Sequence, residues 1–169
     1  MKKEKHPGMS HNILIAYYSH CGNTERVARC IAEITGGDLY LLQPAEAYPA
    51  TYQKVLKQAR NEIRSGYLPP LKECPYDLSK YDTVFLGTPN WCSSIAPPVA
   101  SFLALPGLRG KTIAPFVTHG GGGADQPFQS IRSRGSGLRL LPGFSVYAAG
   151  DSRLTDRLKA WISGINTAA

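Results

Sequence analysis

The chain has 169 residues, of which 43% are hydrophobic, and a formal net charge of +7 at pH 7. This length favours one domain with one core, and no apolar run approaches the roughly 20 residues that a membrane-spanning helix needs. The basic residues are dispersed, which argues against nucleic-acid binding. We therefore expect a cytoplasmic globular protein, with a flexible tail at residues 1–10 and a single domain over residues 11–169.

Apolar runs of strand length alternate with helical stripes in the first half of the chain. Residues 12–19 form a continuous apolar run, typical of a strand buried on both faces of a parallel sheet. A helix is expected over 24–35, a second strand over 38–42 and an amphipathic helix over 51–66. The expected buried stripe of that amphipathic helix consists of Tyr52, Val55, Leu56, Ala59 and Ile63.

The second half continues this alternation. Strands are expected at 82–87 and 111–119, and a fifth strand is split by Pro142 and Gly143. Five strand-then-helix units make an α/β protein, with a parallel sheet covered by helices on both faces in three layers. The remaining helices are expected to begin at Pro97, to include Phe128 and Ile131, and to close the chain over 154–165.

Cysteine spacing gives no sign of a metal site. The chain contains no Cys-x-x-Cys pair and no histidine at metal-finger spacing, so we expect no zinc or iron–sulfur centre. The four cysteines are Cys21, Cys30, Cys74 and Cys92.

The loop after the first strand, Ser19 to Thr24, leads directly into a helix. Ligands of parallel α/β sheets bind outside the carboxyl ends of the strands, and a helix N-terminus there suits an anion. Gly22 lets the backbone approach that anion closely. No Walker or Gly-x-Gly-x-x-Gly pattern is present, which favours a single phosphate monoester over a nucleotide triphosphate or dinucleotide.

Two further loops are expected to meet this one at the same end of the sheet. The loop 87–94 carries Trp91, whose flat ring can form a stacking wall for a planar ligand. The loop 118–126 carries four glycines that allow close backbone approach, and His119, a candidate proton or hydrogen-bond donor. A phosphate seat, an aromatic wall and a glycine-lined side together have the shape of a flavin mononucleotide (FMN) site.

Six segments of the chain resemble short-chain, FMN-binding flavodoxin-like proteins. They are ILIAYYSHCGNTERVA from Ile13, YP-x-x-Y from Tyr48, YDTVFLGTPNW from Tyr81, APPV from Ala96, GKTIAPFVTHGGGG from Gly110 and AWI from Ala160. The resemblance covers about residues 11–165. It implies a flavodoxin-like three-layer α/β/α sandwich, with a five-stranded parallel sheet of order 2-1-3-4-5 and noncovalently bound FMN.

The resemblance also assigns residues to the cofactor site, although His20, Cys21 and Cys92 depart from the commonest residues of the family. It implies no metal and names no catalytic residue. The phosphate is expected to be held by Ser19, His20, Cys21, Gly22, Asn23 and Thr24. The ring is expected to be flanked by Thr88, Pro89, Asn90, Trp91, Cys92, Thr118, His119, Gly120, Gly121, Gly122 and Gly123.

The implied function is electron transfer through the isoalloxazine ring, either as a carrier or as a quinone-type reductase of small acceptors. Well-known carrier flavodoxins are acidic, whereas this chain is basic. A positive field repels basic redox partners and attracts anionic reductants such as NADPH. The charge therefore favours an FMN-dependent NAD(P)H:acceptor oxidoreductase, while a redox partner protein and a homodimer stay open.

Two alternatives compete with this interpretation. Cys21 and Arg26 suggest a cysteine-dependent low-molecular-weight phosphatase, in which a thiolate attacks phosphorus and arginine holds the phosphoryl oxygens. Four residues, not the five that a closed anion cradle requires, separate them. The second alternative is a flavodoxin-fold binding module without cofactor, against which the retained hydroxyls, Trp91 and the glycines argue.

Overall fold

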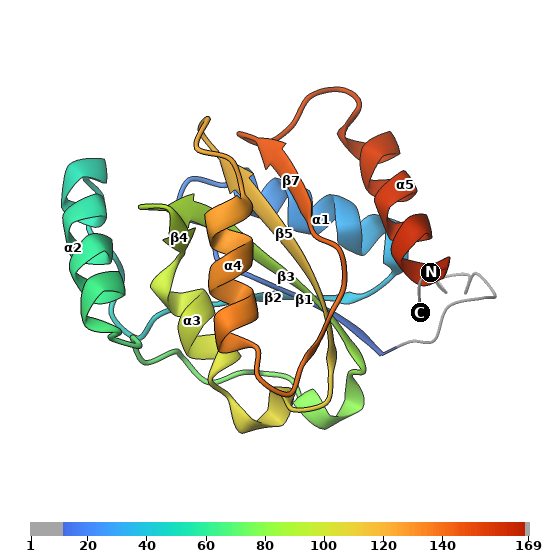
Figure 1. Cartoon of the computed structure of the whole chain (residues 1–169), viewed down its shortest axis with the longest axis horizontal. Helices are drawn as coiled ribbons and strands as arrows, with labels where there is room; N and C mark the ends of the chain where they lie inside the picture. The colour runs from blue at the N-terminus through green and yellow to red at the C-terminus, as the bar shows by residue number, and fades with distance from the viewer. Residues whose placement is uncertain (1–11, 168–169) are drawn as a thin grey trace, which may run out of the picture.

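A sheet of parallel strands lies at the centre of the molecule, with helices on both of its faces (Figure 1). The computed structural model describes residues 12–167, so the tail expected at residues 1–10 lies outside the described residues. The strands are β1 Ile13–Tyr17, β2 Asp38–Leu41, β3 Thr83–Trp91, β4 Ser94–Ile95, β5 Thr112–His119, β6 Arg139–Leu140 and β7 Phe144–Tyr147. The helices are α1 Asn23–Thr35, α2 Tyr52–Ser65, α3 Pro97–Leu103, α4 Asp125–Arg134 and α5 Leu154–Thr167, with short 3₁₀ helices at Leu78–Lys80 and Pro106–Leu108.

The strand order confirms the expected topology. The sheet runs β2-β1-β3-β5-β6, and β7 also pairs in parallel with β5. Because β6 and β7 pair with successive parts of β5, they are two pieces of one edge strand, interrupted at Pro142 and Gly143 as expected. Five parallel strand positions in the order 2-1-3-4-5 result. No helix within residues 12–167 is long and apolar enough to cross a membrane.

The third strand is longer than the sequence pattern indicates. A loop beginning at Gly87 was expected, but β3 continues to Trp91 because its residues up to Pro89 still pair with β5. Pro89 is tolerated there since β1, the neighbour on the other side, pairs only as far as Gly87. The chain then reverses through a two-residue turn into β4, which pairs antiparallel with the end of β3.

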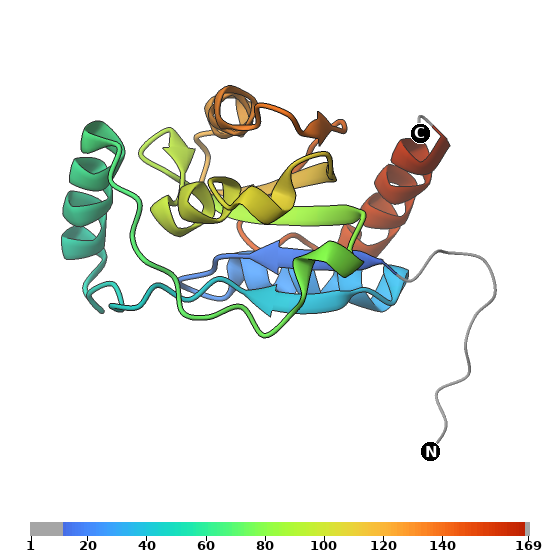
Figure 2. The ribbon, with the colours of Figure 1, turned by 90° about the horizontal axis from the view of Figure 1, so that it is seen from below.

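Alternating residues of each strand build a separate core on either face of the sheet. In β1, Ile13, Ile15 and Tyr17 face the core shared with α1 and α5. Leu14 and Ala16 face the opposite core, which includes α3. This alternation is the two-residue period of a strand, and burial on both faces explains the continuous apolar run. In Figure 2, helix α1 lies behind strands β1 and β2, on the far side of the sheet.

Helix α2 lies beside these layers rather than over the face of the sheet (Figures 1 and 2). It buries only a narrow strip that includes Val55 and Ala59. The expected burial of Tyr52 is wrong, because this side chain at the start of the helix is 60% exposed. The acidic Glu62 is buried instead. The helix lies beside the end of the sheet that is formed by the carboxyl ends of the strands.

Candidate functional site

A pocket of about 180 Å³ opens where β1, β3 and β5 end. It brings together the three loops that the sequence predicts to converge. Eleven of the expected site residues line it, namely Ser19, His20, Cys21, Asn23, Thr24, Pro89, Asn90, Trp91, Thr118, His119 and Gly120. Tyr52 of α2 also lines the pocket.

The first loop, residues 19–24, contributes five residues to the lining of this pocket and has backbone N–H groups without acceptors. Gly22 has φ 87°, a left-handed conformation that glycine adopts without steric cost, and α1 begins at the next residue. The Ser19 hydroxyl accepts hydrogen bonds from the N–H groups of Gly22 (3.1 Å) and Glu25 (3.2 Å). Within residues 12–167, the N–H groups of Cys21, Asn23 and Thr24 have no acceptor. These three donors and the α1 dipole suit an anion.

A buried hydroxyl pair joins the first loop to the end of β5. The Oγ1 atoms of Thr24 and Thr118 lie 2.8 Å apart, and both residues are almost fully buried. One hydroxyl donates to the other, which satisfies two polar groups that burial has removed from water. The pair fixes the N-terminus of α1 against the third loop.

The aromatic wall of the pocket is a packed cluster. Trp91 is only 6% exposed, and its ring lies edge-to-face with Tyr18 and Tyr48, at centroid distances of 5.2 Å in both cases. His20 contacts the same ring at 5.8 Å. The loop position expected for Trp91 is therefore wrong, because this residue ends β3 and packs against neighbouring rings. A stacking contact from Trp91 to a ligand stays a prediction.

The phenols of this cluster are held in their neutral form. Burial raises the pKa of Tyr48 far above its ordinary value, and its hydrogen bond to the Glu62 carboxylate raises the pKa further. Burial is also the main cause of the raised pKa of Tyr18. Gln58 donates a second hydrogen bond to Glu62, at 2.9 Å. The aromatic wall is consequently uncharged at neutral pH, and α2 is tied to it through Glu62.

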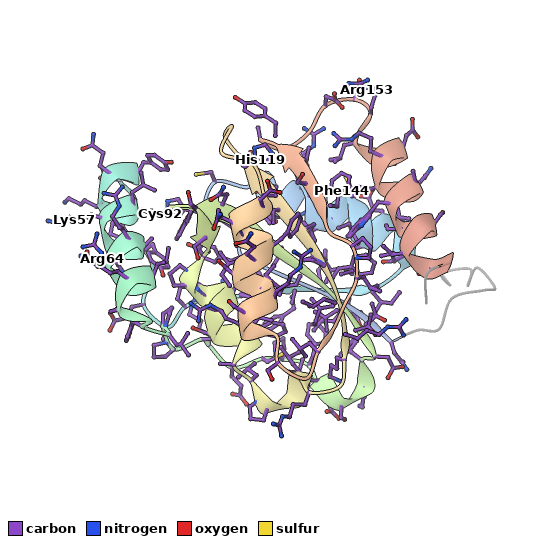
Figure 3. All side chains as sticks on the ribbon, in the orientation of Figure 1. Lys57, Arg64, Cys92, His119, Phe144 and Arg153 are labelled. Atoms are coloured by element: carbon purple, nitrogen blue, oxygen red, sulfur yellow. The ribbon has the colours of Figure 1, made fainter. Side chains whose placement is uncertain are left out.

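The third loop contributes His119 and one glycine to the pocket. The Gly121 N–H donates to His119 Nδ1 at 3.2 Å, so a neutral His119 carries its proton on Nε2. Figure 3 shows His119 at the end of β5. Of the four glycines only Gly120 lines the pocket, whereas Gly121, Gly122 and Gly123 lie beyond it. The Asn90 amide donates to the Gly123 carbonyl at 2.8 Å and so joins the second and third loops.

Gly22 of the first loop also lies outside the pocket lining, as do two further expected residues, Thr88 and Cys92. Thr88 is fully buried, and its hydroxyl accepts a hydrogen bond from the Ala96 N–H at 3.0 Å, which holds the hairpin of β3 and β4. The Cys92 thiol faces the Leu56 carbonyl of α2, at 3.9 Å (Figure 3). Both residues therefore support the pocket from behind, and their contact with a ligand stays a prediction.

Tyr52 is the lining residue that the sequence pattern did not indicate. Its position four residues after Tyr48, in the YP-x-x-Y segment, was the available signal. Helical periodicity instead placed Tyr52 in a buried stripe, because it shares spacing with Val55 and Ala59.

The positions of Cys21 and Arg26 argue against the phosphatase alternative. Cys21 lines the pocket, but Arg26 does not, and the Arg26 N–H bonds to the Gly22 carbonyl inside the first turn of α1. No arginine lines the pocket in the described part of the chain. In residues 12–167, no group of three or more His, Cys, Asp or Glu side chains is placed to hold a metal ion.

Comparison with known proteins gives consistent matches over nearly the whole chain. The flavodoxin family model matches residues 12–165. The crystal structure of a protein from Bacteroides eggerthii is 26% identical, with a TM-score of 0.82, and covers 93% of this chain and 99% of its own. The crystal structure of a protein from Bacteroides uniformis is also 26% identical, with a TM-score of 0.80, and covers 92% of this chain and 99% of its own. A flavoprotein from Lactobacillus acidophilus in complex with FMN is 23% identical, with a TM-score of 0.74. It covers 90% of this chain and 99% of its own.

Proposed function

This chain belongs to the flavodoxin family, and from that premise we propose that it binds FMN and transfers electrons through the isoalloxazine ring. The observation that carries the proposal is the first loop, where Cys21, Asn23 and Thr24 line the pocket and their N–H groups lack acceptors within residues 12–167. Three such donors at a helix N-terminus fit one phosphate monoester. The FMN complex of the Lactobacillus acidophilus flavoprotein, which has the same fold, supports this choice of cofactor.

Each wall of the pocket has a separate part in holding the cofactor. The first loop would bind the phosphate through its N–H groups and through the hydroxyls of Ser19 and Thr24. Pro89, Asn90 and Trp91 would lie on one side of the ring region, and the residues from Thr118 to Gly120 on the other. Bound FMN supplies one- and two-electron redox chemistry, and the protein sets its access and its electrostatic surroundings.

The side chains around the ring region control hydrogen bonding and charge. The buried phenols of Tyr18 and Tyr48 stay protonated and bring no negative charge to the pocket. Nε2 of neutral His119 is a hydrogen-bond donor, because Nδ1 already accepts from Gly121. The net charge of +7 favours an anionic reductant. Reduction of a small quinone-type acceptor by NAD(P)H is therefore the second activity that we propose.

The test is reconstitution followed by spectroscopy. Purified protein, or apoprotein titrated with FMN, is expected to be yellow and to bind one FMN per chain. Colourless protein that takes up no FMN contradicts the proposal. With FMN bound, consumption of NADPH in the presence of a quinone distinguishes a reductase from a carrier, which is reduced by dithionite but does not consume NADPH.

A further inference from the structure

Four basic side chains share the outer side of α2. They recur at every third or fourth residue, the spacing of neighbours on one helical face. All of them are exposed, and Figure 3 shows Lys57 and Arg64 pointing away from the body of the molecule. We call this set the basic face of α2, and its members are Lys54, Lys57, Arg60 and Arg64.

Within residues 12–167, no carboxylate forms an ion pair with the basic face. In the described part of the chain, ion pairs are formed by Arg29 and Arg153, and none involves α2. Glu62 is the one acidic residue of this helix, and it is buried among Tyr48 and Gln58, which donate hydrogen bonds to it. Four positive charges therefore remain open to a partner.

The N-terminus of α2, where the basic face begins, lies at the mouth of the pocket. Tyr52, the first residue of α2, lines the pocket and is 60% exposed, and Lys54 follows two residues later. Because Lys54 and Tyr52 point to different sides of the helix, a molecule bound along the basic face reaches the edge of the pocket where it extends past the N-terminus of α2. A second group of basic residues, Arg132, Arg134 and Arg139, lies elsewhere, since Arg139 pairs with Thr112 at the opposite end of β5.

The length of the basic face indicates the kind of molecule that fits it. Lys54 and Arg64 are ten residues apart, which corresponds to about 15 Å along a helix at a rise of 1.5 Å per residue. One phosphate group of a nucleotide cannot engage charges spread over that distance, whereas a protein surface with several carboxylates can. The exposed Tyr52 is a residue type enriched in protein interfaces.

We propose that the basic face of α2 docks an acidic redox protein, which exchanges electrons with the cofactor pocket beside it. This proposal rests on the proposed function. In the reducing direction, one electron leaves the partner, which is oxidised, and enters the isoalloxazine ring, which is reduced. Charge attraction steers the encounter, and Tyr52 lies where the partner reaches the pocket.

Binding of an acidic [2Fe–2S] ferredoxin, used as the probe, tests the proposal without electron transfer. The Kd between FMN-loaded protein and oxidised ferredoxin is measured at about 10 mM and about 150 mM ionic strength, where the Debye length falls from about 30 Å to about 8 Å. The triple variant Lys57→Gln, Arg60→Gln, Arg64→Gln is expected to weaken binding at least about tenfold at the lower ionic strength, and much less at the higher. The rate of reduction by reduced ferredoxin is expected to fall in parallel.

A matched control separates the basic face from net charge. The variant Arg132→Gln, Arg134→Gln, Arg139→Gln removes the same three charges, so both variants fall from +7 to +4. The control is expected to keep the wild-type Kd within about twofold. Equal losses in the two variants, no binding by wild-type protein, or a larger effect of the α2 variant on binding to duplex DNA would each overturn the proposal. Failure to bind FMN or to be reduced by dithionite would instead refute the proposed function.

Discussion

The two walls of the pocket differ in how they are built. The first loop is a single stretch of backbone, in which Gly22 and Ser19 orient N–H groups that have no partner within residues 12–167. The aromatic wall gathers Tyr18, Tyr48 and Trp91 from three separate segments into buried edge-to-face contacts. The first loop therefore keeps hydrogen-bond donors without partners, whereas the rings of the aromatic wall are already packed against one another.

This difference separates ligand binding from stability. Donors that the described part of the protein does not satisfy are available for an anion. Rings buried against one another contribute mainly to the free energy of unfolding. Substitutions in the aromatic wall should therefore lower stability, whereas changes in the first loop should alter affinity for the phosphate of FMN.

The largest effect is expected from Trp91→Ala. Removing a ring that is only 6% exposed leaves a cavity among Tyr18 and Tyr48, and such changes cost about 3–5 kcal/mol of unfolding free energy. Chemical denaturation of the apoprotein measures this loss. Tyr52→Ala, at an exposed ring of the same pocket, is the control and should cost less than about 0.5 kcal/mol. Similar losses in the two variants would contradict the contrast between buried and exposed rings.

The hydroxyl pair that joins the first loop to the end of β5 should give a smaller effect. Thr24→Val leaves the buried Thr118 hydroxyl without its partner, and we expect a loss of about 1–3 kcal/mol in unfolding free energy. The double variant Thr24→Val, Thr118→Val removes both polar groups, so its loss should be smaller than the sum of the single losses. A double-mutant cycle by urea denaturation measures this coupling, and strict additivity would show that the hydroxyls act independently.

The buried phenols make stability depend on alkaline pH. Because the pKa of Tyr48 is raised by burial and by Glu62, the folded protein keeps a proton that the unfolded chain releases above about pH 10. Below that pH, this group makes no contribution to the pH dependence of the unfolding free energy. Above it, the unfolding free energy falls as the pH rises. Tyr48→Phe should reduce the slope by about 1.4 kcal/mol per pH unit, measured by denaturation across alkaline pH. Trp91→Phe, which keeps every phenol, should retain the wild-type slope.

The smallest effect is expected at the turn behind the aromatic wall. Cys92 and Ser93 both have positive φ, 52° and 59°, as two-residue turns of the primed types require. Ser93→Gly should raise the unfolding free energy by about 0.5 kcal/mol, because relief of the left-handed conformation exceeds the entropy lost by glycine. Ser93→Val should lower it by about 1–2 kcal/mol. Thermal and urea denaturation test the pair, and the reverse order would show that the turn is not strained.

Local patterns in the sequence predict the strands, the helices and the first loop. The strand and helix periods are visible within short windows, and Gly22 with its neighbouring hydroxyls marks a strand-to-helix anion site without reference to distant residues. The resemblance to flavodoxin-like proteins supplied the strand order 2-1-3-4-5, which the structure confirms.

The aromatic wall could not be predicted in the same way. Gly87 and Pro89 are typical of a loop, yet pairing with β5 extends the strand through both. The burial of Trp91 and the exposure of Tyr52 depend on where α2 packs, and helical periodicity specifies which residues share a face but not what covers it.

The central claim is that the first loop recognises the phosphate of FMN. The most direct test measures the Kd values of FMN and of riboflavin, which lacks the phosphate, for wild-type apoprotein and for Gly22→Val. We expect wild-type protein to bind FMN at least about a hundredfold more tightly than riboflavin, since several N–H groups contact a charged phosphate. Gly22→Val, which forces a branched side chain into the left-handed region, should lose most of that preference. Equal affinities of wild-type protein for the two flavins would contradict the account.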